Sequence, residues 1–108
     1  MKNIPYYPTN YPSDLTDAQW EKLSRFFPLG SNSKTHKRSL LEAVLYLIDN
    51  GCKWRALPHD YPKWSTVKSF YYRAIKDDTW KNMIQFMSRD IRIIANKAED
   101  SSHGLIDS

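Results

Sequence analysis

Glycine and cysteine are scarce in this chain, and long apolar runs are missing from it. Three glycines among 108 residues are too few for the tight hairpin turns of an all-β protein. The single cysteine, Cys52, excludes a disulfide within the chain and fits a reducing compartment. No apolar segment reaches the roughly 18 residues that cross a bilayer, and the first residues lack the apolar core of a signal peptide. We therefore expect a cytoplasmic protein with no membrane partner.

Positive charge is concentrated in one part of the chain. The whole chain carries a net charge of +4, whereas residues 34–76 hold nine Lys and Arg against three Asp and Glu, a local charge of +6. A basic block of this kind attracts a polyanion such as DNA, although it is also typical of an ordinary solvated surface. Apolar residues make up 41% of the chain, which is enough for the core of one small domain.

The spacing of apolar residues predicts an all-α protein, with a small helical bundle over residues 14–96. Residues 1–13 are rich in Pro and Tyr and are expected to form an extended N-terminal arm. Its aromatic rings are expected to pack on the domain, with stacking on nucleic acid as the alternative. Thr16 and Gln19 form a capping-box pattern that starts the first helix at Asp17. The second helix, over about 37–50, is apolar nearly all round and is therefore the expected central helix, ended by Gly51.

The second half of the bundle is expected to contain one helical turn and two long helices. The turn falls at 53–57, and a proline-bounded loop follows it, with Trp54 and Trp64 packing that loop onto the core. Ser65 is the expected N-cap of a third helix that runs to about Lys76. A fourth helix, capped by Asp77, Asp78 or Thr79, is expected to run to about 96 and to be followed by a polar linker.

The third helix has one apolar face and one polar, basic face. Val67, Phe70, Tyr71 and Ala74 share the apolar face. A basic helix placed after a turn can enter the major groove of DNA, so we predict a helix-turn-helix-like element, although its loop is longer than the usual turn. An ordinary amphipathic surface helix has the same pattern. The candidate DNA-binding residues are Lys53, Arg55, Lys63, Ser65, Thr66, Lys68, Ser69, Tyr72, Arg73 and Lys76.

Arg55, the histidines and Cys52 have other candidate roles. Arg55 is expected either to contact a phosphate or to pair with Asp49 or Asp60. The histidines and Cys52 lack metal-ligand spacing, so neither a metal site nor a cofactor is expected within this chain.

Residues 51–76 contain Gly-Cys, Trp-Arg, Leu-Pro and Trp-Ser-Thr-Val, followed by aromatic and basic residues. This set of sequence motifs resembles the N-terminal region of bacterial insertion-element transposases of the insertion-sequence-five family. The similarity extends back through residues 11–20 and 41–46 and forward through residues 78–80, and about residues 11–108 are covered. The resemblance implies a DNA-binding domain that recognises the terminal inverted repeats of the element during transposition, a form of DNA recombination.

The resemblance also assigns a role to the last residues. In that family the helical domain precedes an RNase H-like catalytic core of the DDE type, whose three carboxylates hold two metal ions. The first strand of that core characteristically reads Ile-Asp-Ser, as do residues 106–108. By resemblance, Asp107 is the first catalytic carboxylate, and 97–108 are a linker and the start of a truncated core. Because one carboxylate cannot hold two metals, we expect the 108-residue chain alone to be inactive, with Mg²⁺ needed only by a full-length enzyme.

Several functions remain open on the sequence alone. The chain fits the DNA-binding part of a transposase, a stand-alone helix-turn-helix regulator of the element, or a helical protein-interaction domain. The expected partner is double-stranded DNA, and a catalytic half encoded in a second reading frame, or another copy of the chain, is a further candidate partner. The sequence is equally consistent with two origins of the chain. It is either the product of the first reading frame of a transposase that ribosomal frameshifting completes, or a truncated remnant of one.

Overall fold

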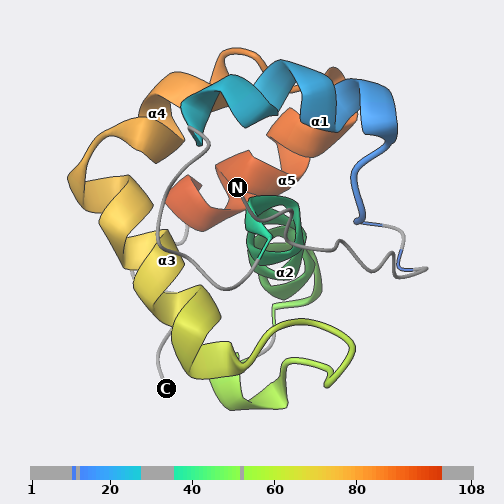
Figure 1. The fold of residues 1–108 in the computed structure, drawn as a ribbon, viewed down its shortest axis with the longest axis vertical. Coiled ribbons are helices and arrows are strands. Elements are labelled where there is room, and N and C mark those ends of the chain that lie inside the picture. The colour runs from blue at the N-terminus through green and yellow to red at the C-terminus, as the bar shows by residue number, and fades with distance from the viewer. Residues whose placement is uncertain (1–10, 12, 28–35, 52, 101–108) are drawn as a thin grey trace, which may run out of the picture.

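The computed structural model of the chain describes residues 11, 13–27, 36–51 and 53–100. In this part there are helices and no strands, so the predicted all-α class is confirmed (Figure 1). The elements are α1 (Asp17–Leu23), η1 (Ser24–Phe26), α2 (Lys37–Asn50), η2 (Trp54–Ala56), α3 (Trp64–Lys76), α4 (Thr79–Ile84) and α5 (Arg89–Asp100), where η marks a single 3₁₀ turn.

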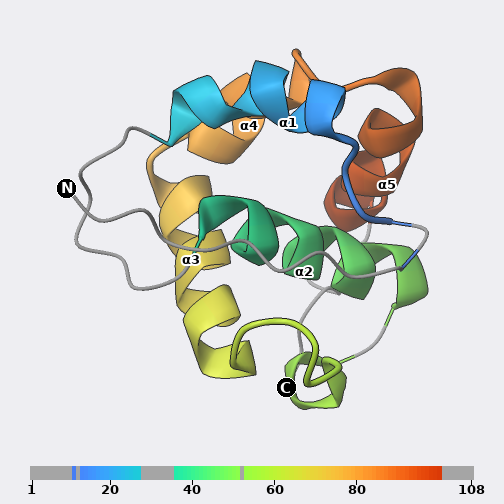
Figure 2. The same cartoon turned by 45° about the vertical axis from the view of Figure 1, so that its right-hand side comes forward.

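The second helix lies at the centre of the fold, as its sequence predicts. α2 packs against both α3 and α5, and α3 packs against α4. Figure 2 shows α2 running through the middle of the molecule, with α1 and α4 above it. Seven apolar side chains of α2 are no more than 6% exposed: Leu40, Leu41, Ala43, Val44, Leu45, Leu47 and Ile48. The helix ends at Gly51, whose φ of 64° is the left-handed conformation that favours glycine.

The start of α1 has the predicted capping box. The Thr16 hydroxyl accepts a hydrogen bond from the Gln19 backbone N–H at 3.1 Å. The Gln19 side chain in turn accepts one from the Thr16 N–H at 2.7 Å. These two bonds satisfy backbone donors that the first turn of a helix leaves open, which explains why α1 begins at Asp17.

Two helix boundaries differ from the prediction. α3 begins at Trp64, because the Lys63 carbonyl already accepts hydrogen bonds from the Thr66 and Val67 N–H groups. The prediction that Ser65 is the N-cap is therefore wrong, and this serine lies in the first turn of the helix. α5 ends at Asp100, four residues later than expected, so residues 97–100 are helical.

The single fourth helix expected over 79–96 is also wrong, because the chain turns at 85–88 and forms two helices. The Arg92 guanidinium donates to the carbonyls of Gln85 and Met87, both at 3.2 Å. Ser88 accepts a hydrogen bond from the Gln19 side chain at 2.9 Å. These contacts satisfy polar groups that the break would otherwise leave open and tie the turn to α1.

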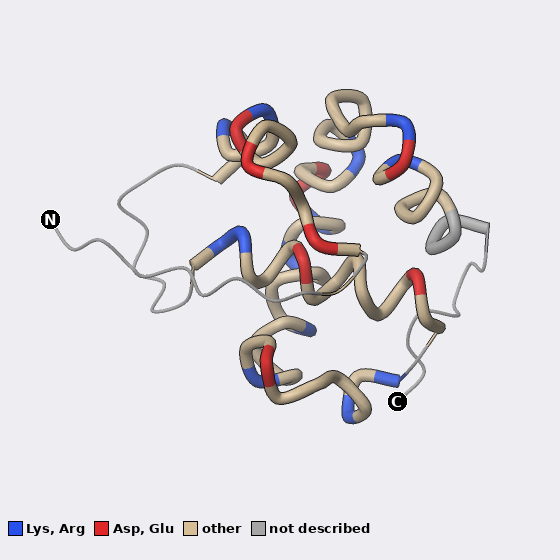
Figure 3. Tube along the Cα trace, turned by 90° about the vertical axis from the view of Figure 1, so that its right-hand side faces the viewer, with Lys and Arg blue, Asp and Glu red and all other residues tan. Residues whose placement is uncertain are grey.

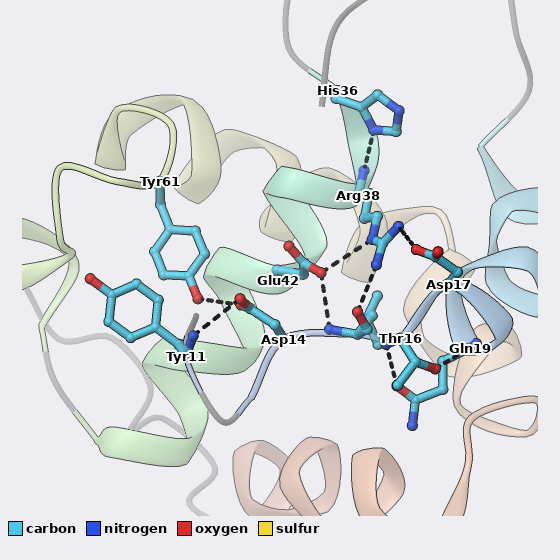
Figure 4. A network of polar contacts seen from close by, with 10 residues as sticks. Tyr11, Asp14, Thr16, Asp17, Gln19, His36, Arg38, Glu42 and Tyr61 are labelled. Atoms are coloured by element: carbon cyan, nitrogen blue, oxygen red, sulfur yellow. Dashed lines mark hydrogen bonds and ion pairs between the residues drawn. The ribbon is translucent and has the colours of Figure 1, made fainter. Parts of the chain in front are cut away.

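A buried polar network fastens the segment before α1 to α2 (Figure 4). Arg38 and Glu42, one turn apart on α2, are both buried and form an ion pair at 3.2 Å. Arg38 also donates to the Leu15 carbonyl at 2.7 Å, and the Leu15 N–H donates to Glu42 at 2.9 Å. Arg38 additionally contacts the exposed carboxylate of Asp17 at 2.8 Å. Arg38 belongs to the basic block of residues 34–76, but its guanidinium is paired within the domain.

Aromatic side chains continue this attachment toward the loop before α3 (Figure 4). The Tyr11 ring stacks on Tyr61 with centroids 5.2 Å apart and meets Tyr46 edge-on at 4.9 Å. The Tyr61 hydroxyl donates to Asp14 and the Tyr11 hydroxyl donates to Asp60, both at 2.7 Å. The predicted packing of N-terminal aromatic rings is confirmed for Tyr11, whereas residues 1–10 and 12 of the proposed arm lie outside the described residues.

The N-cap of α2 makes the stability of the domain sensitive to acid. The His36 Nδ1 atom accepts the Arg38 backbone N–H at 3.1 Å, which requires a neutral ring at that nitrogen. Burial, and then the Arg38 charge, lower the pKa of His36. Because the unfolded histidine has a pKa of about 6.5, the unfolded state binds more protons below that pH. We expect the free energy of unfolding to fall as the pH drops below about 6.5 and to level off below the folded pKa.

The urea midpoint, measured between pH 7.5 and pH 5, checks this expectation. His36→Asn is the matched control, since asparagine is a good N-cap acceptor that does not titrate. The difference between the two profiles isolates His36 from the carboxylates, and parallel profiles would contradict the assignment.

Candidate nucleic-acid interface

The outer face of α3 is polar and free of acidic residues. The apolar side chains Val67, Phe70, Tyr71 and Ala74 are no more than 8% exposed and face the core, as predicted. Ser65, Ser69, Tyr72 and Lys76 lie on the opposite side, at the spacing of successive helical turns. We call these four residues the outer stripe. In Figure 1, α3 runs along one edge of the molecule, so no described helix covers this face in that view.

One flank of the outer stripe carries two cations held on one indole ring. The guanidinium carbon of Arg55, in η2, lies 5.4 Å from the centroid of the Trp64 ring. The Lys68 ammonium nitrogen lies 6.0 Å from the same ring. Both distances fall within the range of a cation–π contact. We call Arg55, Trp64 and Lys68 the Trp64 cluster, which joins η2 to the first turns of α3.

The other flank carries a second pair of cations. The Lys37 ammonium nitrogen lies 5.8 Å from the centroid of the Phe70 ring. Arg73 lies one helical turn after Phe70 on α3 and therefore projects to the same flank. Partial burial, and then the charge of Arg73, lower the pKa of Lys37. We call Lys37, Phe70 and Arg73 the Phe70 cluster. Because Lys68 and Arg73 are five residues apart on the helix, they project to opposite flanks of the outer stripe.

All ten predicted DNA-binding residues lie in the described part of the chain, and each is exposed or partly exposed. The structure brings Arg55 together with Lys68, and it places Lys53 and Lys63 directly before η2 and α3. Figure 3 shows Lys and Arg gathering around η2 and the following loop, at the lower end of the molecule. Sequence reasoning did not include Lys37 and Trp64 in the site. Lys37 belongs to the basic block of residues 34–76, so the local charge was a signal that could have included it. Trp64 was expected only to pack the loop onto the core.

Arg55 makes a contact that neither sequence alternative included. Its guanidinium lies over the Trp64 ring, and Asp60, one of the two acids expected to pair with it, accepts the Tyr11 hydroxyl. A guanidinium has five N–H donors, so a cation–π contact leaves donors for a further partner.

Asp107, the carboxylate that the resemblance assigns to metal binding, lies outside the described residues. Among the residues that are described, no three His, Cys, Asp or Glu side chains lie together as a metal site. Each helix in this same part of the chain is too short or too polar to cross a membrane.

Comparison with known proteins assigns the chain to a family. Residues 15–84 match a family profile described as "Putative transposase of IS4/5 family". The chain belongs to this IS4/5 transposase family. The IS4/5 match runs from the segment before α1 to the end of α4, so it contains the outer stripe and both cation clusters, whereas α5 follows it.

One curated relative of this IS4/5 chain is an uncharacterized protein, y4sN, from Sinorhizobium fredii (strain NBRC 101917 / NGR234). It is 34% identical over 80 aligned residues, and the alignment covers 70% of this chain and 64% of the relative. The chain therefore spans less than two thirds of the length of that protein. No solved structure matches the IS4/5 chain.

Proposed function

We propose that this chain is the DNA-binding part of an insertion-element transposase, and that it recognises the terminal inverted repeats of the element through α3. The observation that carries the proposal is the arrangement of the outer face of α3. A polar stripe without acidic residues lies between two pairs of cations, and Arg55, Lys68 and Lys37 are each held against an aromatic ring. Membership of the IS4/5 transposase family supports the same function.

The arrangement matches the chemistry of a DNA groove. The major groove is about 12 Å wide and admits one α-helix, with a phosphate backbone on each side. With α3 in the groove, the Trp64 cluster would face one backbone and the Phe70 cluster the other. Phosphate contacts fix the position of a protein on the duplex, while side chains facing the base edges read the sequence. Ser65, Ser69, Tyr72 and Lys76, the four residues of the outer stripe, all carry hydrogen-bonding groups that would reach base edges.

The connection between α2 and α3 bears on how the helix is presented. It spans residues 51–63 and contains η2, which is longer than the three- or four-residue turn of a usual helix-turn-helix. In the proposed complex this longer connection has a use, because it delivers Arg55 to the side of α3. The proposal is therefore a helix-turn-helix-like element in which the connection also contributes a phosphate contact.

Binding to a duplex that carries the inverted repeat is expected to weaken steeply with salt. If the four cations of the two clusters each neutralise one phosphate, the slope of log K against log salt should be about −3.6. Raising the salt from 50 to 200 mM should then reduce the affinity by about 150-fold. Fluorescence anisotropy with a labelled duplex measures this slope, and a scrambled duplex of equal length measures sequence preference.

Arg73→Ala tests the assignment to α3, with Arg89→Ala as its matched control. Both arginines are exposed, but Arg89 begins α5 and lies outside the two clusters. Arg73→Ala should weaken binding to both duplexes and make the slope shallower by about 0.9, whereas Arg89→Ala should leave the slope unchanged. An absence of binding at low salt would overturn the DNA-binding proposal and favour a protein-interaction domain. Equal effects of the two substitutions would exclude α3 as the binding surface.

A further inference from the structure

We infer that Trp64 is a positioning residue that holds Arg55 and Lys68 together as a preformed clamp for the phosphates of one DNA backbone at the start of α3. The inference rests on the proposed function and names a residue outside the predicted binding set. Its basis is the convergence of two cations on one ring, with distances of 5.4 Å for Arg55 and 6.0 Å for Lys68.

The two cations come from different elements and need a common support. Arg55 is in η2 and Lys68 is in the second turn of α3, with residues 57–63 between the two elements. Arg and Lys side chains lose much rotamer freedom when they bind a ligand. An indole attracts cations more strongly than other aromatic rings. Contact with Trp64 therefore places both side chains before DNA arrives and offsets part of their mutual repulsion.

The acid nearest in sequence is engaged elsewhere. Asp60 is the only acidic residue between Gly51 and Lys76, and its carboxylate accepts the Tyr11 hydroxyl at 2.7 Å. The first turn of α3 adds to the attraction for an anion. No side chain caps the helix at Lys63, and the N-terminal end of a helix carries partial positive charge.

Trp64 is less buried than the other tryptophan of this region. The tryptophan that anchors this region to the core is Trp54, which is 1% exposed and lies 6.0 Å from the Tyr71 ring. Trp64 is only partly buried, so its ring can serve the surface as well as the core. This division between the two tryptophans makes the role of Trp64 separable from folding by substitution.

Trp64→Leu, which keeps apolar volume but removes the ring, is the decisive variant, and Trp64→Phe is its conservative partner. In the otherwise wild-type protein, Trp64→Leu should weaken duplex binding by about 5- to 30-fold and make the salt dependence shallower. Trp64→Phe should recover part of the loss. In an Arg55→Gln, Lys68→Gln background, Trp64→Leu should have no further effect on binding, because the cations through which it acts are gone. Thermal melting of each variant accounts for changes in stability.

The outcomes separate the clamp from the proposed function. If the wild-type protein binds DNA and Trp64→Leu changes nothing, the clamp is wrong and DNA binding stands. An equal loss in the background without the two cations would show a structural role for the ring and would also overturn the clamp. If the wild-type protein binds no DNA at low salt, the proposed function fails, and the phosphate clamp fails with it.

Discussion

Replacing Glu42 with alanine is expected to destabilise the domain by about 3–5 kcal/mol, the usual cost of removing one partner of a buried ion pair. The Glu42 side chain is 1% exposed and accepts hydrogen bonds from Arg38 at 3.2 Å and from the Leu15 N–H at 2.9 Å. The substitution would leave a buried guanidinium and a buried N–H without this acceptor. Urea denaturation followed by circular dichroism measures the change.

Asp17→Ala is the matched control for this experiment. Asp17 contacts the same guanidinium at 2.8 Å, but its side chain is 98% exposed. Exposed ion pairs contribute little because water already solvates them, so this change should cost a small fraction of the Glu42 effect. Similar losses for the two substitutions would show that burial of the Arg38–Glu42 pair does not govern its contribution.

Phe70→Ala is expected to cost about 3–5 kcal/mol, because it removes a large buried ring and leaves a cavity. Phe70 is 7% exposed, and its ring lies 5.5 Å from that of Phe27. The same substitution removes the ring beneath Lys37, so it should weaken DNA binding even at temperatures where the domain stays folded. Melting curves and anisotropy titrations of one preparation measure both effects.

The neighbouring residue provides the control for Phe70. Ser69→Ala changes an exposed position of the same helix turn and should shift stability by no more than about 0.5 kcal/mol. A stable Phe70→Ala variant beside a destabilised Ser69→Ala variant would mean that α3 presents the opposite face to the core.

Features that depend on neighbouring residues were predictable from the sequence. The capping box at Thr16 and Gln19, the buried α2 and the left-handed Gly51 all follow from short-range patterns. The inward face of α3 followed from helical periodicity. In each case the determining residues lie within a few positions of one another.

Features that depend on distant residues were not predictable. The break between α4 and α5 is supported by Arg92 and by a hydrogen bond from Gln19, which is 69 positions from Ser88. The helical spacing of apolar residues continues across that break, because Met83, Met87 and Ile91 all face the core. That spacing therefore predicted one helix where the structure has two. The Trp64 cluster likewise required a contact across the loop between η2 and α3, and no spacing rule indicates where such a loop returns.

The attachment of the first described residues to α2 affects how the domain opens. Leu15 belongs to no helix, yet its N–H and carbonyl are both bonded to buried charged groups of α2. Segments outside regular structure usually fray with little free-energy cost, but this one can detach only if Arg38 and Glu42 lose partners in the interior. Residues 13–16 therefore belong to the same cooperative unit as the central helix. Asp14 and Tyr61 connect this unit by a hydrogen bond to the loop that leads into α3. We therefore expect local opening at the N-terminal side to loosen the proposed binding surface.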